Sequence, residues 1–272
     1  MGKIEEALEK AKKMREKREE KEETPSPEIP LSPAYAQTKV IPTDLLKLEK
    51  NKIIAATKSK EAYEYYRFLK TQILHRMEKN GWNCLLITSA LPGEGKTLTA
   101  INLSITLARE ITKTVLLMEA DLRNPSIAEL LQISVQKGLA NYLIEKDCPL
   151  SECLINPGFE RLVILPAGKI IQDTTEIMGS PKMQSLLQEV KNRYKDRYIL
   201  IDSPPLLTFA DALTLSPYVD AVLLVVEVYK TTIEQVKRVL ELLEEKPLLG
   251  IVLNKAPIPE KPGYYSSYYY SE

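Results

Sequence analysis

Hydrophobic residues follow two alternating patterns along this chain. Short, uninterrupted apolar runs have the length of strands that are buried on both faces, and they span residues 84–88, 114–118, 162–165, 198–201, 221–226 and 248–253. Longer segments with apolar positions at helical spacing lie between them, most clearly at residues 60–79, 96–109, 181–194 and 231–244. Apolar strands that alternate with helices are typical of a parallel sheet covered on both faces. The pattern therefore predicts an α/β fold with a doubly wound, mostly parallel sheet.

The N-terminal segment has a different pattern, because charges of both signs dominate residues 1–24. A narrow apolar stripe at helical spacing runs through them, made of Ile4, Leu8, Ala11 and Met14. Two interpretations stay open for this helical arm: a solvated, partly frayed helix, or a docking helix whose apolar stripe a partner covers. Four prolines between residues 25 and 33 then predict an extended linker.

These patterns divide the chain into a charged helical arm at 1–24, a proline-containing linker at 25–56, a globular domain at 57–256 and a tail at 257–272. We expect the tail to be flexible, because it contains several prolines and no aliphatic cluster after residue 258. Five of the chain's 14 tyrosines lie in it: Tyr264, Tyr265, Tyr268, Tyr269 and Tyr270. Taken alone, this cluster fits either a low-complexity aromatic segment or a set of acceptors for modification.

Composition narrows the possible functions. The 37 basic residues balance the 37 acidic residues, and this argues against nucleic acid as a partner, since phosphate neutralisation usually leaves a basic excess. The three cysteines, Cys84, Cys148 and Cys153, form no CxxC pair and indicate reduced thiols. No apolar run reaches the roughly 18 residues that a membrane span needs. We therefore expect a soluble, cytoplasmic protein.

The most specific motif is the phosphate-binding loop Ala90–Thr97, which lies between a predicted strand and a predicted helix. Such a loop needs small residues whose backbone amides point at phosphate oxygens, a helix N-terminus behind it, a lysine for the phosphate charge and a hydroxyl for Mg²⁺. This sequence supplies all four, and the residues expected to bind the nucleotide are Gly93, Glu94, Gly95, Lys96, Thr97 and Leu98. The motif predicts binding of ATP or GTP.

Acidic residues follow two further predicted strands. Asp202 comes directly after the apolar run 198–201, and Glu119 and Asp121 follow the run 114–118. Because parallel strands end at the same edge of a sheet, these carboxylates are expected beside the phosphate-binding loop. Their position predicts an Mg²⁺ site made by Thr97, Asp121 and Asp202.

The loop Ala90–Thr97 and the segments Glu119–Arg123 and Asp202–Pro205 together resemble the bacterial tyrosine kinases of exopolysaccharide assembly, which are related to the septum-positioning (MinD-like) and partitioning (ParA-like) P-loop ATPases. The resemblance runs from about residue 57 to the C-terminus. It implies that Asp202 occupies the Walker B position and Asp121 that of the second acid of the Walker A′ motif. Glu119 stands where the family usually has the first acid, an aspartate.

The resemblance also implies an activity and an assembly. The activity is ATP-dependent autophosphorylation of the tyrosine cluster between copies of the chain, with Lys96, Asp121 and Asp202 as catalytic residues. Asn254 is expected against the purine base. Glu64, Arg67 and Lys70 correspond to a motif for ring assembly, with Lys70 in place of the last arginine. The implied partners are further copies of the chain, a membrane-embedded chain-length adaptor that recruits the protein to the inner face of the plasma membrane, and a cognate tyrosine phosphatase.

Two other functions remain compatible with the motifs. One is a membrane-cycling ATPase of the septum-positioning or partitioning type, in which the tyrosines are structural. Such ATPases carry a lysine early in the phosphate loop, where this chain has Leu91 and Pro92, and this difference favours the kinase. The other is a non-catalytic, nucleotide-sensing scaffold. The sequence also leaves open whether Asp121 accepts the tyrosine proton or binds the metal.

Overall fold

The computed structural model describes residues 38–57, 60–193, 196–244 and 246–257. The predicted helical arm, the first part of the linker and the tyrosine cluster lie outside the described residues. In the described part, no helix is long and apolar enough to cross a membrane.

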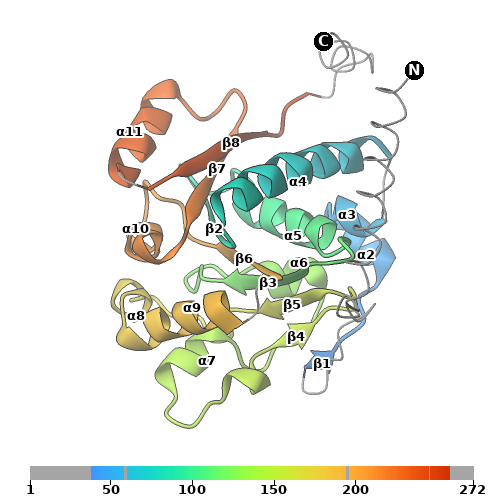
Figure 1. Cartoon of the computed structure of the whole chain (residues 1–272), viewed down its shortest axis with the longest axis vertical. Coiled ribbons are helices and arrows are strands. Elements are labelled where there is room, and N and C mark those ends of the chain that lie inside the picture. Colours follow the sequence, from blue (N-terminus) through green and yellow to red (C-terminus); the bar gives the residue numbers. More distant parts are fainter. Residues whose placement is uncertain (1–37, 58–59, 194–195, 245, 258–272) are drawn as a thin grey trace, which may run out of the picture. The chain divides into compact units, whose positions relative to one another are not determined.

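A single sheet forms the centre of the described domain (Figure 1). Its eight described strands are arranged in the order β1-β4-β5-β3-β6-β2-β7-β8, and all neighbouring pairs are parallel except β4 and β5. Their bounds are β1 Lys39–Val40, β2 Cys84–Ser89, β3 Thr114–Glu119, β4 Ile155–Asn156, β5 Leu162–Leu165, β6 Arg197–Asp202, β7 Ala221–Glu227 and β8 Leu248–Asn254. The sheet confirms the predicted mostly parallel α/β fold.

Helices cover both faces of this sheet. One face packs against α2 (Leu45–Lys50), α3 (Ile54–Thr57), α4 (Lys60–Asn80), α5 (Lys96–Leu107) and α6 (Ile127–Leu131). The other packs against α7 (Leu139–Ile144), α8 (Thr175–Met178), α9 (Pro181–Arg193), α10 (Asp211–Leu215) and α11 (Ile233–Leu243). Two short 3₁₀ helices span Leu150–Glu152 and Ser216–Tyr218.

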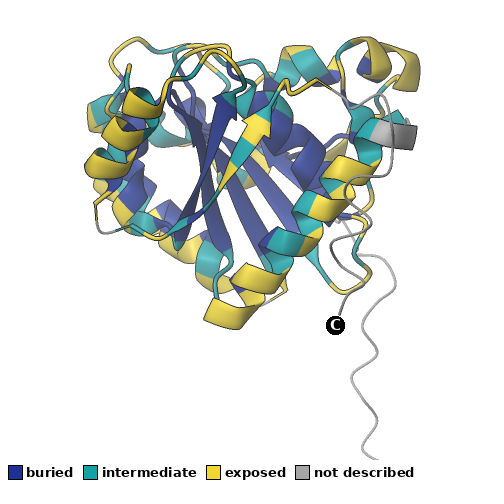
Figure 2. Ribbon diagram, turned by 90° about the horizontal axis from the view of Figure 1, so that it is seen from above, coloured by how far each residue is buried: buried dark blue, intermediate teal, exposed yellow. Residues whose placement is uncertain are grey.

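The two covered faces explain why the strands are apolar throughout. In β2, Leu85 and Ile87 belong to the core beneath α4 and α5, whereas Cys84 and Leu86 belong to the core on the opposite face. Every residue of β2 is buried, and Figure 2 shows the central strands as buried between exposed helical surfaces. Burying one large aliphatic side chain contributes about 1.5–3 kcal/mol, so both faces of a central strand stabilise the fold.

The folded domain begins earlier than the sequence predicts. Residues 39–56 were expected in the linker, but the structure places β1, α2 and α3 there, with Leu48 and Ile53 fully buried. The buried Asn102 of α5 fixes this segment, because its Oδ1 accepts a hydrogen bond from the backbone of Ala55 at 2.8 Å and its Nδ2 donates to the carbonyl of Lys52 at 3.1 Å. Such short elements have no long hydrophobic period, and this is why the pattern did not reveal them.

Candidate active site

The phosphate-binding loop connects β2, the strand between β6 and β7, to the N-terminus of α5. Gly93 and Gly95 adopt positive φ angles of 81° and 95°, which residues with a Cβ atom rarely adopt. At Gly95 a Cβ would also lie only 2.0 Å from Nδ2 of Asn254. No side chain caps the N-terminus of α5, so its first backbone amides are available to an anion.

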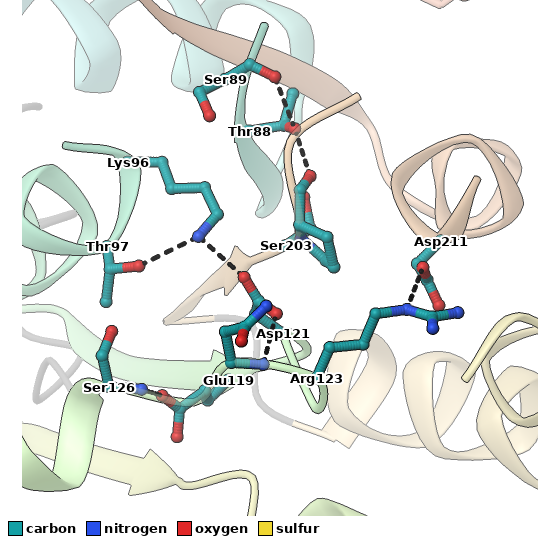
Figure 3. A network of polar contacts seen from close by, with 12 residues as sticks. Thr88, Ser89, Lys96, Thr97, Glu119, Asp121, Arg123, Ser126, Ser203 and Asp211 are labelled. Carbon is teal, nitrogen blue, oxygen red and sulfur yellow. Dashed lines mark hydrogen bonds and ion pairs between the residues drawn. The ribbon is translucent and has the colours of Figure 1, made fainter. Parts of the chain in front are cut away.

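Figure 3 shows the Lys96 side chain between Thr97 and Asp121. Its Nζ is 2.8 Å from Oδ2 of Asp121 and 3.3 Å from Oγ1 of Thr97. Burial lowers the pKa of Lys96, but the surrounding carboxylates, led by Asp202 and then Asp121, outweigh burial and raise the pKa overall. The lysine is therefore protonated at neutral pH and carries the positive charge that a nucleotide phosphate needs.

Asp202 ends β6 beside this lysine and is completely buried. Neither of its carboxylate oxygens has a hydrogen-bond partner among the described residues. Burial raises its pKa to about 7, although the charge of Lys96 and the nearby hydroxyl of Thr97 oppose that rise. A buried carboxylate without partners is costly, and a cation or an ordered water normally satisfies it.

These groups fit Mg²⁺, although the described residues contain no cluster of three or more His, Cys, Asp or Glu side chains suited to a metal. Mg²⁺ prefers oxygen ligands and usually binds one or two carboxylates together with nucleotide phosphates and water. The unpartnered carboxylate of Asp202, the hydroxyl of Thr97 and the carboxylate of Asp121 supply that kind of incomplete ligand set.

The two acids after β3 have different environments. The oxygens of Glu119 accept backbone hydrogen bonds from Ser126 (2.6 Å), Ile127 (2.7 Å) and Ala167 (2.9 Å). Asp121 instead places one oxygen against Lys96 and accepts a hydrogen bond from Asn124 with the other, at 3.1 Å. Glu119 therefore fixes the loops around the site, while Asp121 faces Lys96.

Arg123 connects the loop that carries Asp121 to two neighbouring segments through its side-chain contacts. Its Nε lies 3.5 Å from Oδ2 of the buried Asp211, and its guanidinium lies over the ring of Phe209 at 4.9 Å. It also donates to the carbonyl of Gln172. Sequence reasoning quoted Arg123 only within a motif and missed Asp211, because nothing in the local sequence marks a contact across 88 positions.

The end of β8 contacts the phosphate-binding loop from the other side. Asn254 Nδ2 donates to the carbonyl of Glu94 at 2.8 Å. The next residue, Lys255, donates to the carbonyl of Gly93 at 2.9 Å and pairs with Glu227 at 3.0 Å. The structure thus brings Asn254 and Lys255 to the phosphate-binding loop, two contacts that no sequence pattern indicated.

The three residues of α4 that were predicted for ring assembly differ in how far they are exposed. Glu64 and Arg67 form an exposed ion pair of 2.8 Å with each other. Lys70 pairs with Glu110 of the same chain, and its side chain is only 18% exposed. The Lys70 side chain is therefore paired within its own domain and largely covered. The side chains of Glu64 and Arg67 are exposed.

Comparison with known proteins gives consistent results. The model of an AAA-domain family, AAA_31, matches residues 85–247. Tyrosine-protein kinase YwqD of Bacillus subtilis (strain 168) is 32% identical over 220 residues, 79% of this chain and 91% of YwqD. The succinoglycan biosynthesis transport protein ExoP of Rhizobium meliloti (strain 1021) is 32% identical over 192 residues, 68% of this chain but 23% of ExoP.

Among solved structures, the kinase domain of VpsO superposes with a TM-score of 0.63 at 31% identity, covering 78% of this chain and 97% of that domain. The matches in sequence and in structure thus both include proteins named as kinases. Together with the geometry around Lys96, they show that this chain belongs to the bacterial tyrosine-protein kinases built on a P-loop ATPase domain.

Proposed function

We propose that this protein transfers the γ-phosphoryl group of ATP to tyrosines of the C-terminal cluster of a second copy of the chain, and that this reaction regulates exopolysaccharide polymerisation and export. One observation carries the proposal most directly. Lys96, Asp121 and the unpartnered Asp202 meet at the carboxyl edge of the sheet, next to a phosphate-binding loop. Membership of the tyrosine-kinase family supports tyrosine as the acceptor, and the name of ExoP supports the polysaccharide context.

In this proposal the backbone amides of Gly93–Leu98 and the Lys96 ammonium bind the β- and γ-phosphates. Thr97, Asp121 and Asp202 would hold Mg²⁺, which would supply positive charge opposite the phosphates. The tyrosine oxygen forms the new bond to the γ-phosphorus, the bond from that phosphorus to the β–γ bridging oxygen breaks, and ADP leaves. Asp121 is placed either to receive the phenolic proton or to share the metal.

Asn254 is the residue that we propose against the purine base. One N–H of its Nδ2 donates to the carbonyl of Glu94, which leaves the second N–H and Oδ1 for the base. Membership of the tyrosine-kinase family, rather than this amide, supports ATP as the phosphoryl donor.

Transfer between chains agrees with the position of the cluster, since Tyr264 follows the last described strand by ten residues. The exposed pair Glu64–Arg67 is the surface that we propose for contact between copies. The further partners are a membrane chain-length adaptor, which brings the protein to the inner face of the plasma membrane, and a cognate tyrosine phosphatase.

Incubation with Mg·ATP followed by phosphopeptide mapping tests the activity, with Lys96→Met as the inactive control. The kinase proposal expects phosphate on residues 264–270 of the wild type and none on the variant. The alternative, a membrane-cycling ATPase, expects ATP to be hydrolysed while these tyrosines stay unmodified. That outcome would overturn the proposal.

A further inference from the structure

Glu94 places a carboxylate within the phosphate-binding loop, where it adds negative charge beside the proposed site for an anion. Its side chain is completely buried. Within the described residues, it takes part in no ion pair. The carboxylate must therefore be satisfied by hydrogen bonds, and its two oxygens show how.

One oxygen acts within the loop and the other outside it. Oε2 of Glu94 accepts from the backbone amide of Leu91 at 2.8 Å, and this bond closes the first part of the loop on itself. Oε1 accepts from the hydroxyl of Thr231, which lies 137 positions away in the turn between β7 and α11. The Glu94 side chain thus connects the phosphate-binding loop to that turn.

The hydroxyl of Thr231 serves as donor and acceptor at once. While it donates to Glu94, it accepts a hydrogen bond from the backbone amide of Glu227 at 3.0 Å. The backbone amide of Thr231 in turn donates to the carbonyl of Glu227 at 3.0 Å. Two hydrogen bonds therefore join Glu227 and Thr231 across the turn. A hydroxyl can fill both roles, whereas a methyl group of the same size fills neither.

We propose that Glu94 is a positioning residue, which holds the phosphate-binding loop in its nucleotide-binding conformation through Thr231. The carboxylate does not contact the phosphates; it shapes the backbone that does. The conformation of the turn at residues 227–231 then sets the affinity for the nucleotide. This inference rests on the proposed nucleotide site. It adds Thr231, in the turn before α11, to the residues that shape that site.

Thr231→Val is the test, because it removes the hydroxyl and keeps the size of the side chain. Hydrogen bonds to charged groups contribute about 1.5–3 kcal/mol, so the Kd for a fluorescent ADP analogue should rise at least tenfold. Thr231→Ser keeps the hydroxyl and should restore a Kd within about twofold of wild type. If Thr231→Val does not fold, Thr231→Ala serves in the same comparison.

The neighbouring residue supplies a matched control. Thr232 caps α11, with its hydroxyl accepting from Gln235 at 3.3 Å, and it makes no contact with Glu94 among the contacts of the described chain. Thr232→Val should lower the stability of the protein and leave the Kd unchanged. An equal rise in Kd for both valine variants, or none for Thr231→Val, would overturn the proposal. Failure of the wild type itself to bind ADP would instead refute the nucleotide site.

Discussion

Replacing Asp202 by asparagine should make the nucleotide-free protein more stable at alkaline pH. The carboxyl group is fully buried without a hydrogen-bond partner, and burial raises its pKa to about 7 from its ordinary value of 3.8. Because the folded state favours the neutral form, this group contributes stability below about pH 4 that is lost as the pH rises to about 7. The difference between these two pKa values corresponds to about 4 kcal/mol.

The amide cannot ionise, so Asp202→Asn escapes this loss. We expect the variant to exceed the wild type by about 2–4 kcal/mol in unfolding free energy at pH 8, with the advantage shrinking as the pH falls toward 5. Urea denaturation in EDTA without nucleotide measures the difference. The same variant should lack kinase activity, because it removes a proposed Mg²⁺ ligand.

A second buried aspartate provides the control. Asp211 is equally inaccessible, but it pairs with Arg123 and accepts a hydrogen bond from Thr174. Asp211→Asn should therefore destabilise the protein, by about 1–3 kcal/mol. An Asp202→Asn variant that is no more stable than the wild type at pH 8, or whose advantage does not change with pH, would refute the reasoning about the unpartnered carboxylate.

Three further changes test other parts of the site. Gly95→Ala should abolish binding of a fluorescent ADP analogue in an otherwise folded protein, because φ is 95° and a Cβ would lie 2.0 Å from Asn254; tight binding by this variant would contradict the loop geometry. Glu119→Gln should lower the unfolding free energy by about 1–3 kcal/mol in urea denaturation, since a single amide oxygen cannot accept all three backbone hydrogen bonds; unchanged stability would argue against that structural role. In sedimentation velocity, Arg67→Ala should weaken self-association more than Lys70→Ala, because the Arg67 side chain is exposed whereas that of Lys70 is largely covered; the reverse order would contradict the proposed surface.

The regular parts of the fold were predictable because burial on both faces leaves a direct trace in the sequence. The run 84–88 became β2, and the run 162–165 became β5. The helix predicted at 60–79 became α4, one residue longer. The short elements β1, α2 and α3 were missed, because contacts such as Asn102 with Ala55 stabilise them across about fifty positions rather than through their own pattern.

For the candidate site, the sequence predicted which motif residues lie near one another but not which way their side chains point. Motif residues such as Lys96 and Asp202 come together because the ends of parallel strands share one edge of the sheet. The direction of each side chain was not predictable: Glu94 points toward Thr231, and Glu119 accepts hydrogen bonds from backbone amides. These assignments depend on loops that meet only in the folded chain, so no spacing along the sequence encodes them.

The reaction proposed for this chain is phosphorylation of the tyrosine cluster of another copy. A mixture of two full-length variants tests it most directly. One carries Lys96→Met and keeps its tyrosines; the other keeps Lys96 and has Tyr264, Tyr265, Tyr268, Tyr269 and Tyr270 replaced by phenylalanine. After incubation with Mg·ATP, we expect phosphotyrosine in the cluster of the Lys96→Met chain and none when either variant is incubated alone. An unmodified cluster in the mixture, under conditions in which the wild type is modified, would contradict transfer between chains.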